Sequence, residues 1–174
     1  SRGLVSAKSA PYFSTETPVW TQFSYDVLGR QTQVTHPDGT VARTEYTPWY
    51  ITLTDERGNL KRKFPDAYDR LKEVEELNGR ESYRTTYQYD VAGSLTRVTN
   101  HLGHLTTMTY DLLGRKSSMT DPNMGAWSYA YDLGGNLTSQ TDAKNQTITF
   151  TYDSQSRLLT KRYPDNRQIT WTYD

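Results

Sequence analysis

The sequence contains no cysteine, no long hydrophobic run and no excess of charge of either sign. Without cysteine, no disulfide can stabilise the fold, and the redox compartment cannot be inferred. No apolar run approaches the roughly 18 residues that a membrane span needs, and no secretory signal is visible at Ser1. The net charge of +0 argues against nucleic acid as a partner, because phosphate binding draws on clustered Lys and Arg.

Hydrophobic residues are also scarce, at 34% of 174 residues, which is low for a conventional globular core. Aromatic residues are plentiful by contrast: 14 Tyr, 4 Trp and 4 Phe. Tyr, Trp, Phe and the many Thr residues all suit the pleated surface of a sheet. The composition therefore predicts strands throughout the chain.

A tyrosine–aspartate pair recurs with a pitch of 21 residues. The pairs are Tyr89-Asp90, Tyr110-Asp111, Tyr131-Asp132, Tyr152-Asp153 and Tyr173-Asp174, and Tyr25-Asp26 begins the same series. A fixed period of this size is typical of repeat proteins, in which each unit buries its surfaces only against its neighbours.

The residues before each aspartate alternate in character. The positions three and one residues before it are apolar and almost always aromatic: Phe23/Tyr25, Tyr87/Tyr89, Met108/Tyr110, Tyr129/Tyr131, Phe150/Tyr152 and Trp171/Tyr173. The positions between and before them hold small or polar residues such as Thr107/Thr109 and Thr149/Thr151. This alternation predicts a strand with an aromatic face and a small polar face.

A turn is expected after each aspartate, because glycine tolerates positive φ and aspartate caps backbone amides. Gly29, Gly93, Gly114 and Gly135 stand three residues after the aspartate, with Asp69 and Ser156 at the equivalent places, and Arg30, Arg70, Arg115 and Arg157 often follow. A second strand and a second turn signal, such as Asp121 to Gly125, complete the unit. The pattern predicts an antiparallel meander of about seven units and about 14 strands.

Two segments depart from the pattern. A degenerate region is expected around residues 46–70, with Pro65 in place of the tyrosine and Pro48 marking a bulge or bend. Residues 1–19 lack the repeat and are predicted to be a lead-in, either an edge strand or a poorly ordered segment. The repeat array is assigned to residues 20–174. Since the chain starts and stops in mid-pattern, we expect it to be part of a longer protein.

The segment from Tyr110 to Arg115, followed by Met119 to Asn123 and Tyr129 to Asp132, resembles the consensus of the YD-repeat, or Rhs-repeat, family. The resemblance covers roughly residues 20–174. It implies a sheet that spirals into a curved wall of a hollow shell, as in bacterial polymorphic toxins, insecticidal toxin complexes and teneurins. It also implies a secreted or bacterial cell-surface location, and an enclosed toxin domain as partner. No segment resembles the family's autocatalytic plug, so a wall segment without protease or cargo is expected.

Four sets of residues have alternative interpretations. The aromatic face could bind a carbohydrate or cell-surface glycan, or it could stabilise the sheet by cross-strand pairing, which its recurrence in every unit favours. The aspartates could act as paired acid–base carboxylates, but turn capping suits them better. His101 and His104, with His36 elsewhere, have a zinc-like spacing but no further ligand pattern. The arginines could form a basic stripe, or pair with neighbouring acids.

These observations favour a structural function. We predict a non-catalytic segment of a β-shell that encapsulates or scaffolds a toxin domain, with no cofactor and no metal. The alternative is a carbohydrate-binding adhesion module. An open sheet with an aromatic face also predicts that the isolated segment self-associates.

Overall fold

The computed structural model describes residues 3–174, and they form strands and turns without a helix. The sixteen strands are β1 (Ala7–Ser9), β2 (Trp20–Tyr25), β3 (Gln31–Thr35), β4 (Val41–Tyr46), β5 (Ile51–Thr54), β6 (Leu60–Pro65), β7 (Leu71–Asn78), β8 (Glu81–Tyr89), β9 (Leu95–Thr99), β10 (Leu105–Tyr110), β11 (Lys116–Asp121), β12 (Gly125–Tyr131), β13 (Leu137–Thr141), β14 (Thr147–Tyr152), β15 (Leu158–Arg162) and β16 (Gln168–Thr170). Within the described residues, no helix has the length and apolarity to cross a bilayer.

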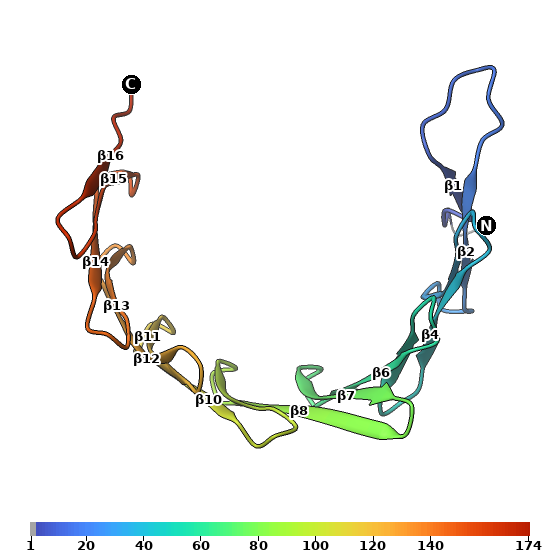
Figure 1. The fold of residues 1–174 in the computed structure, drawn as a ribbon, viewed down its shortest axis with the longest axis horizontal. Coiled ribbons are helices and arrows are strands. Elements are labelled where there is room, and N and C mark those ends of the chain that lie inside the picture. The colour runs from blue at the N-terminus through green and yellow to red at the C-terminus, as the bar shows by residue number, and fades with distance from the viewer. Residues whose placement is uncertain (1–2) are drawn as a thin grey trace. The chain divides into compact units, whose positions relative to one another are not determined.

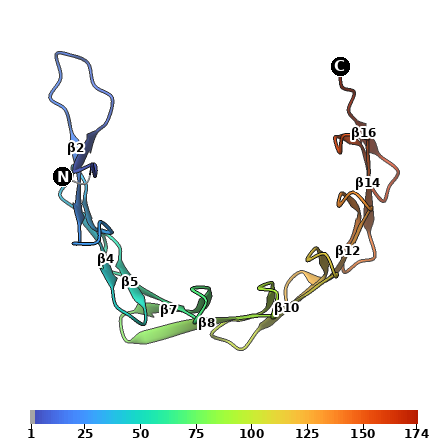
Figure 2. The same cartoon turned by 180° about the vertical axis from the view of Figure 1, so that it is seen from behind.

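The strands follow one another in chain order as a single antiparallel sheet, with β1 and β16 at its edges. The chain divides into two compact units, the first ending at Thr86 and the second running Tyr87–Asp174. Within the second unit, β10 to β16 succeed one another along the sheet (Figure 1), and β2 to β7 do the same within the first (Figure 2). The predicted all-β antiparallel meander is confirmed.

The structure has sixteen strands where the sequence predicted about 14, and the lead-in contributes one of the additional strands, β1. Ala7 pairs with Gln22 and Ser9 with Trp20, so residues before the array extend the sheet by one strand. Residues 1–2 of the predicted lead-in lie outside the described residues. The first strand that ends in a Tyr-Asp pair begins at Trp20.

The segment 46–70 contains ordinary hairpins with an altered spacing. Tyr46-Thr47 follows Tyr25-Asp26 by one full pitch, and residues 47–50, with Pro48 and Trp49 at the tip, join β4 to β5. The Thr47 N–H donates to the Tyr50 carbonyl at 3.0 Å, which closes this tight turn. Pro48 therefore lies in a loop, where its missing N–H costs no ladder hydrogen bond.

No conventional core exists in this fold. Among the described residues no hydrophobic side chain is buried, and only Thr52 and Glu75 are less than a tenth exposed. Stability must come from ladder hydrogen bonds and from cross-strand pairs on two half-exposed faces. On one face of the second unit, Met108 lies opposite Met119. On the other, the Thr141 and Thr147 hydroxyls are 2.8 Å apart.

Candidate functional site

The aspartate of the Tyr-Asp pair begins a five-residue turn. In the turn at Asp111, the Asp111 N–H donates to the Arg115 carbonyl at 2.9 Å, and the Gly114 N–H donates to the Asp111 carbonyl at 3.0 Å. Gly114 has a φ of 76°, and Ser156 at the equivalent place has 63°. This geometry is a type I turn followed by a left-handed residue, which joins antiparallel strands with a bulge. The same two hydrogen bonds close the turns at Asp26, Asp66, Asp90, Asp132 and Asp153.

The aspartate side chain holds the turn together. One oxygen of Asp111, Oδ1, accepts the N–H groups of Leu113 and Arg115, each at 2.9 Å, and Oδ2 accepts Nε of Arg115 at 2.7 Å. The same arrangement occurs at Asp26 with Arg30, Asp66 with Arg70 and Asp153 with Arg157. The carboxylate is thus fully engaged by its own turn.

These contacts decide the protonation of the aspartates. The backbone N–H of Arg115, together with its side chain, holds the pKa of Asp111 below its ordinary value of 3.8. A general acid needs the opposite shift, and paired carboxylates at hydrolytic sites push one of the two pKa values upward. The aspartates therefore have the properties of turn caps.

Five of the second turns, at His36, Asp55, Asn100, Asp142 and Tyr163, have the same backbone, which the sequence interpretation did not foresee, whereas the loops after Asn78 and Asp121 differ. The Asp55 N–H donates to the Asn59 carbonyl at 3.1 Å, and the Gly58 N–H donates to the Asp55 carbonyl at 3.0 Å. At Asn100, the side-chain oxygen accepts the His104 N–H at 2.9 Å. The signal was present in the sequence as Asp or Asn three residues before Gly or Asn.

Two second turns begin with a residue that cannot cap, and there the cap moves two positions along the chain. His36 begins one such turn, and Asp38 Oδ1 accepts the Thr40 N–H at 2.9 Å. Tyr163 begins the other, and Asp165 Oδ1 accepts the Arg167 N–H at 3.1 Å. The first residue of the Tyr163 turn is therefore released from capping.

The tyrosine of the pair connects its strand to the strand before it. The Tyr131 hydroxyl donates to the carbonyl of Lys116, the first residue of β11, at 2.9 Å. The same 15-residue separation joins Tyr46, Tyr110, Tyr152 and Tyr173 to a main-chain carbonyl. Each hydroxyl fixes the start of one turn against the strand that leaves the preceding turn.

The arginine extends this connection from one turn to the next. The Arg115 guanidinium carbon lies 4.7 Å from the centroid of the Tyr131 ring, and Nη1 donates to the Asp132 carbonyl at 2.9 Å. Equivalent stacking places Arg30 over Tyr46 at 4.1 Å and Arg157 over Tyr173 at 4.5 Å. We call this set, exemplified by Asp111, Arg115 and Tyr131, the Asp–Arg–Tyr contact.

Two of these turns have another residue in place of the arginine. Ser94 ends the turn at Asp90, and Asn136 ends the turn at Asp132. Asn136 donates through Nδ2 to Asp132 Oδ2 at 3.0 Å, so the turn remains capped. Burial, together with the Asp132 carboxylate, raises the pKa of Tyr152, and burial with Asp90 does the same to Tyr110. The aspartate of one turn therefore faces the tyrosine of the next.

The remaining candidates from the sequence are distributed among these turns. Arg30, Arg70, Arg115 and Arg157 each pair with the aspartate of their own turn at 2.6–2.7 Å, so they do not form a free basic stripe. The His104 ring lies 3.4 Å from the Asn100 amide, and His36 lies 2.9 Å from Glu56. Across residues 3–174, no three His, Cys, Asp or Glu side chains gather in a way that could hold a metal ion.

Apolar residues occupy the tips of the same turns. Val91, Leu112 and Leu133, each directly after the aspartate, are fully exposed at 108%, 105% and 106% of their reference areas. We call these three side chains the apolar tips. Their position follows from the turn geometry, because the first loop residue points away from both strands.

The comparisons with known proteins agree with this architecture. The RHS Repeat family model matches residues 14–41, 89–123 and 131–168, which together exceed half of the chain. No curated protein sequence matches the chain.

Several solved structures share the fold. The crystal structure of TcdB2-TccC3-Cdc42 aligns with a TM-score of 0.70 and 19% identity, over 83% of this chain and 8% of that one. A TcdB2-TccC3 crystal structure gives a TM-score of 0.69 and 20% identity, over 83% and 8% of the two chains. A Photorhabdus luminescens Tc holotoxin pore gives 0.69 and 20%, over 85% and 9%. The chain spans less than a tenth of the length of these structures, and at this identity the likeness shows a common fold.

Proposed function

Because the chain belongs to the RHS repeat family, we propose that residues 20–174 form part of the wall of an Rhs-type β-shell that encloses or scaffolds a toxin domain. The partners in this proposal are the rest of the parent chain and the enclosed domain, in a secreted or cell-surface bacterial protein. The likeness to chains in structures named for toxin complexes supports the proposal.

The observation that carries the proposal is the absence of a core combined with the contacts between successive turns. A domain that folds around a buried core would bury several large apolar side chains, but none of the described ones is buried. Instead, five tyrosines are hydrogen-bonded to the preceding strand, namely Tyr46, Tyr110, Tyr131, Tyr152 and Tyr173, and the Asp–Arg–Tyr contact joins neighbouring turns. Such nearest-neighbour bonding builds a sheet of any length and suits a wall.

We propose that this wall segment is not catalytic. The aspartates are engaged by their turns, and the pKa values of Asp26, Asp66, Asp111 and Asp153 are lowered by their hydrogen bonds to the turn N–H groups and to the following arginine. A carboxylate that is ionised at neutral pH is a poor general acid, and a lowered pKa also makes it a weak general base.

Limited proteolysis of the full parent protein tests the proposal. In the intact protein, we expect the domain enclosed by the wall to resist a protease that digests the same domain expressed alone. Replacing Tyr110, Tyr131 and Tyr152 together by Ala removes three inter-strand hydrogen bonds and should make the enclosed domain cleavable. The matched control is Tyr129→Phe, which removes a hydroxyl without a protein partner. Equal digestion rates for the enclosed and the isolated domain would contradict enclosure.

A further inference from the structure

The second unit contains a hollow of about 320 Å³ between two of its second turns. The turn at Asp142 and the turn at Tyr163 flank it, and β12, β13 and β14 supply its floor. Its nine lining residues are Trp127, Gln140, Asp142, Gln146, Ile148, Tyr163, Pro164, Asp165 and Arg167. This volume is at the small end of the range of ligand-binding pockets.

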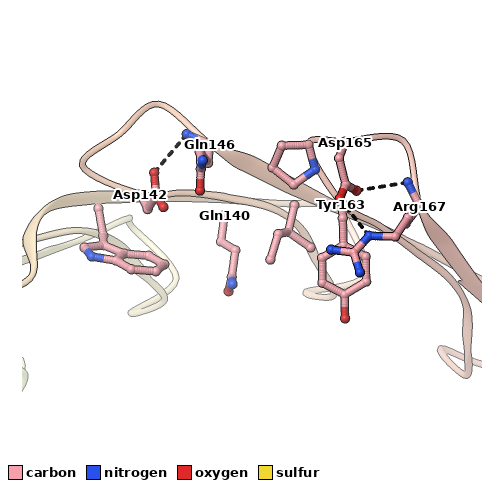
Figure 3. A pocket seen from close by; sticks show the side chains of 9 residues that line it. Gln140, Asp142, Gln146, Tyr163, Asp165 and Arg167 are labelled. Carbon is pink, nitrogen blue, oxygen red and sulfur yellow. Dashed lines mark hydrogen bonds and ion pairs between the residues drawn. The ribbon is translucent and has the colours of Figure 1, made fainter.

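The floor of the hollow carries an amide where the two preceding units have an apolar side chain and the following unit has Lys161. Gln140 pairs with Tyr129 on one side and Ile148 on the other, so it lies on the aromatic face. The positions one and two pitches earlier are Met119 and Val98. No side-chain hydrogen bond joins the Gln140 amide to another described residue. Figure 3 shows this side chain projecting from the same side of the ribbon as the Tyr163 ring.

The two aromatic residues of the hollow are also departures from the repeat. Trp127 stands where neighbouring units have Thr106 and Ile148, and its indole N–H donates to the Met124 carbonyl at 3.1 Å, which fixes the ring. Tyr163 stands where most units have a capping residue such as Asp142, and Asp165 has taken over the cap. Three residues that the repeat does not require therefore line one hollow.

The charges around the hollow are largely compensated. Asp165 accepts Nε of Arg167 at 2.6 Å, which neutralises both groups. Asp142 accepts the N–H groups of Lys144 and Gln146 at 2.9 and 2.8 Å through the same oxygen. A site without net positive charge does not favour phosphate or nucleotide ligands. What remains free is amide and phenol groups, which both donate and accept hydrogen bonds.

The Trp127 indole beside the free Gln140 amide suits a neutral, polyhydroxylated ring. The Tyr163 ring has the Lys161 ammonium and the Arg167 guanidinium 4.8 and 5.7 Å from its centroid, so its part in the site is its hydroxyl. A pyranose presents axial C–H groups to an aromatic face and its hydroxyls to amides that can both donate and accept. Trp127 and Tyr163 lie three strands apart, or roughly 14 Å at the usual strand spacing, which leaves room for one or two sugar rings. A peptide would instead be expected at a strand edge, where it can continue the ladder, but this hollow lies on the face of the sheet.

We propose that the hollow lined by Trp127, Gln140 and Tyr163 binds one or two rings of a neutral oligosaccharide. This function is additional to the structural role of the wall. Because the hollow is shallow and single, a dissociation constant on the order of 1 mM is expected, so several copies of the protein on one surface are needed for firm attachment.

Titration of the ¹⁵N-labelled protein with cellobiose, lactose and N,N′-diacetylchitobiose tests the proposal. At least one disaccharide should give saturable shifts of the Trp127 indole N–H and the Gln140 side-chain amide. Trp127→Ala and Gln140→Leu should each weaken binding by about tenfold. Gln140→Leu keeps the side-chain volume, and a thermal melt checks that both variants fold. Trp49→Ala, at an exposed turn of the first unit, is the matched control and should leave binding unchanged.

Two results would overturn the proposal. One is the absence of saturable shifts at Trp127 and Gln140 with all three disaccharides. The other is binding of an extended, blocked hexapeptide at these residues without binding of any disaccharide. In that case the hollow is a peptide site.

Discussion

The hairpins β5 to β8 of the first unit and the repeats of the second unit solve the same structural problem with different side chains. In the second unit, the face opposite the aromatic ladder carries paired hydroxyls, such as Thr151 and Thr160 at 2.7 Å. In the first unit, the equivalent face carries a row of charges that includes the buried carboxylate of Glu75. Residues 42–88, where the spacing departs from the 21-residue pitch, also lie between the segments that the family model matches.

The charged row lies in strict register across four strands. Thr52 pairs with Arg62, Arg62 with Glu75, and Glu75 with Arg84. Glu75 accepts hydrogen bonds from Ser82 at 2.8 Å, Arg84 at 3.0 Å and Arg62 at 3.2 Å. Beside this row, the rings of Tyr50 and Phe64 pack with centroids 5.3 Å apart.

The comparison indicates that the length of a repeat unit varies where ion pairs, such as those of Glu75, replace the hydroxyl pairs of the regular units. A uniform array of hydroxyls tolerates a slip of register, because every position resembles the next. A buried carboxylate with two arginines has one satisfactory partner set. The irregular hairpins therefore need the charged row to define their pairing, whereas the regular repeats obtain it from the Tyr-Asp turns.

The largest effect is expected at the centre of the charged row. Glu75→Gln leaves Arg62 without its carboxylate and Arg84 with Glu73 alone, and it should lower the free energy of unfolding by about 3 kcal/mol. Urea unfolding combined with hydrogen exchange of β6 to β8 measures it. Glu76→Gln is the control, because its ion pair with Lys61 is half exposed and should contribute at most about 0.5 kcal/mol. Equal losses of unfolding free energy in the two variants would show that Glu75 contributes no more than a half-exposed ion pair does.

A second test concerns contact between neighbouring turns of the regular repeats. A Cβ on Gly125 would lie 2.4 Å from the Ala143 Cβ, and the residue has a φ of 72°. Gly125→Ala should therefore cost about 2 kcal/mol or more. Gly103→Ala has the same backbone demand without a neighbour within 4 Å and should cost about 1 kcal/mol. Adding Ala143→Gly should bring the Gly125 variant to the cost of the control, and failure of this rescue would exclude the turn contact as the cause.

The tyrosine hydroxyl is the third test. Tyr131→Phe removes the hydrogen bond to the Lys116 carbonyl and should lower stability by about 1 kcal/mol. Tyr129→Phe, on the same strand and the same face, removes a hydroxyl without a protein partner and should have a smaller effect. Chemical denaturation of both variants measures the two losses of unfolding free energy. A larger loss at Tyr129 would contradict the assignment of the inter-strand bond.

The pH dependence of stability is the fourth test. Because the pKa of Asp111 is lowered in the folded state, its contribution is present above the ordinary value of 3.8 and is lost as pH falls through the folded value. Asp111→Asn should reduce this loss, since Asn100 shows that an amide oxygen caps the same turn at 2.9 Å. The urea midpoint should thus fall less steeply in the variant as the pH is lowered from about 5 to below the ordinary value of 3.8. Parallel profiles for variant and wild type would contradict the assignment.

The smallest free-energy change per site is expected at the apolar tips. Replacing Val91, Leu112 and Leu133 together by Lys should reduce self-association of the isolated chain and leave its stability within about 0.5 kcal/mol. Light scattering at several protein concentrations measures this. If the wild-type chain is strictly monomeric, the prediction of self-association is wrong.

Much of the fold could be predicted from residue spacing alone. The positions of Tyr110, Asp111 and Gly114 within one pitch are enough to predict a strand, a cap and a left-handed turn residue. The Asp–Arg–Tyr contact could not be predicted, because its tyrosine bonds to a main-chain carbonyl, which leaves no trace in residue identity. The Glu75 row was missed for a related reason. It depends on the register of four strands whose loops depart from the pitch.

The 15-residue separation between Tyr131 and its carbonyl partner has a further consequence for how such chains change in evolution. Both this bond and the stacking of Arg115 on Tyr131 lie within one 21-residue period. Excision of residues 112–132 would join Asp111 to Leu133 and reproduce a complete turn at the junction. Unequal crossing-over by whole periods can therefore lengthen or shorten the array while every surviving turn keeps its partners.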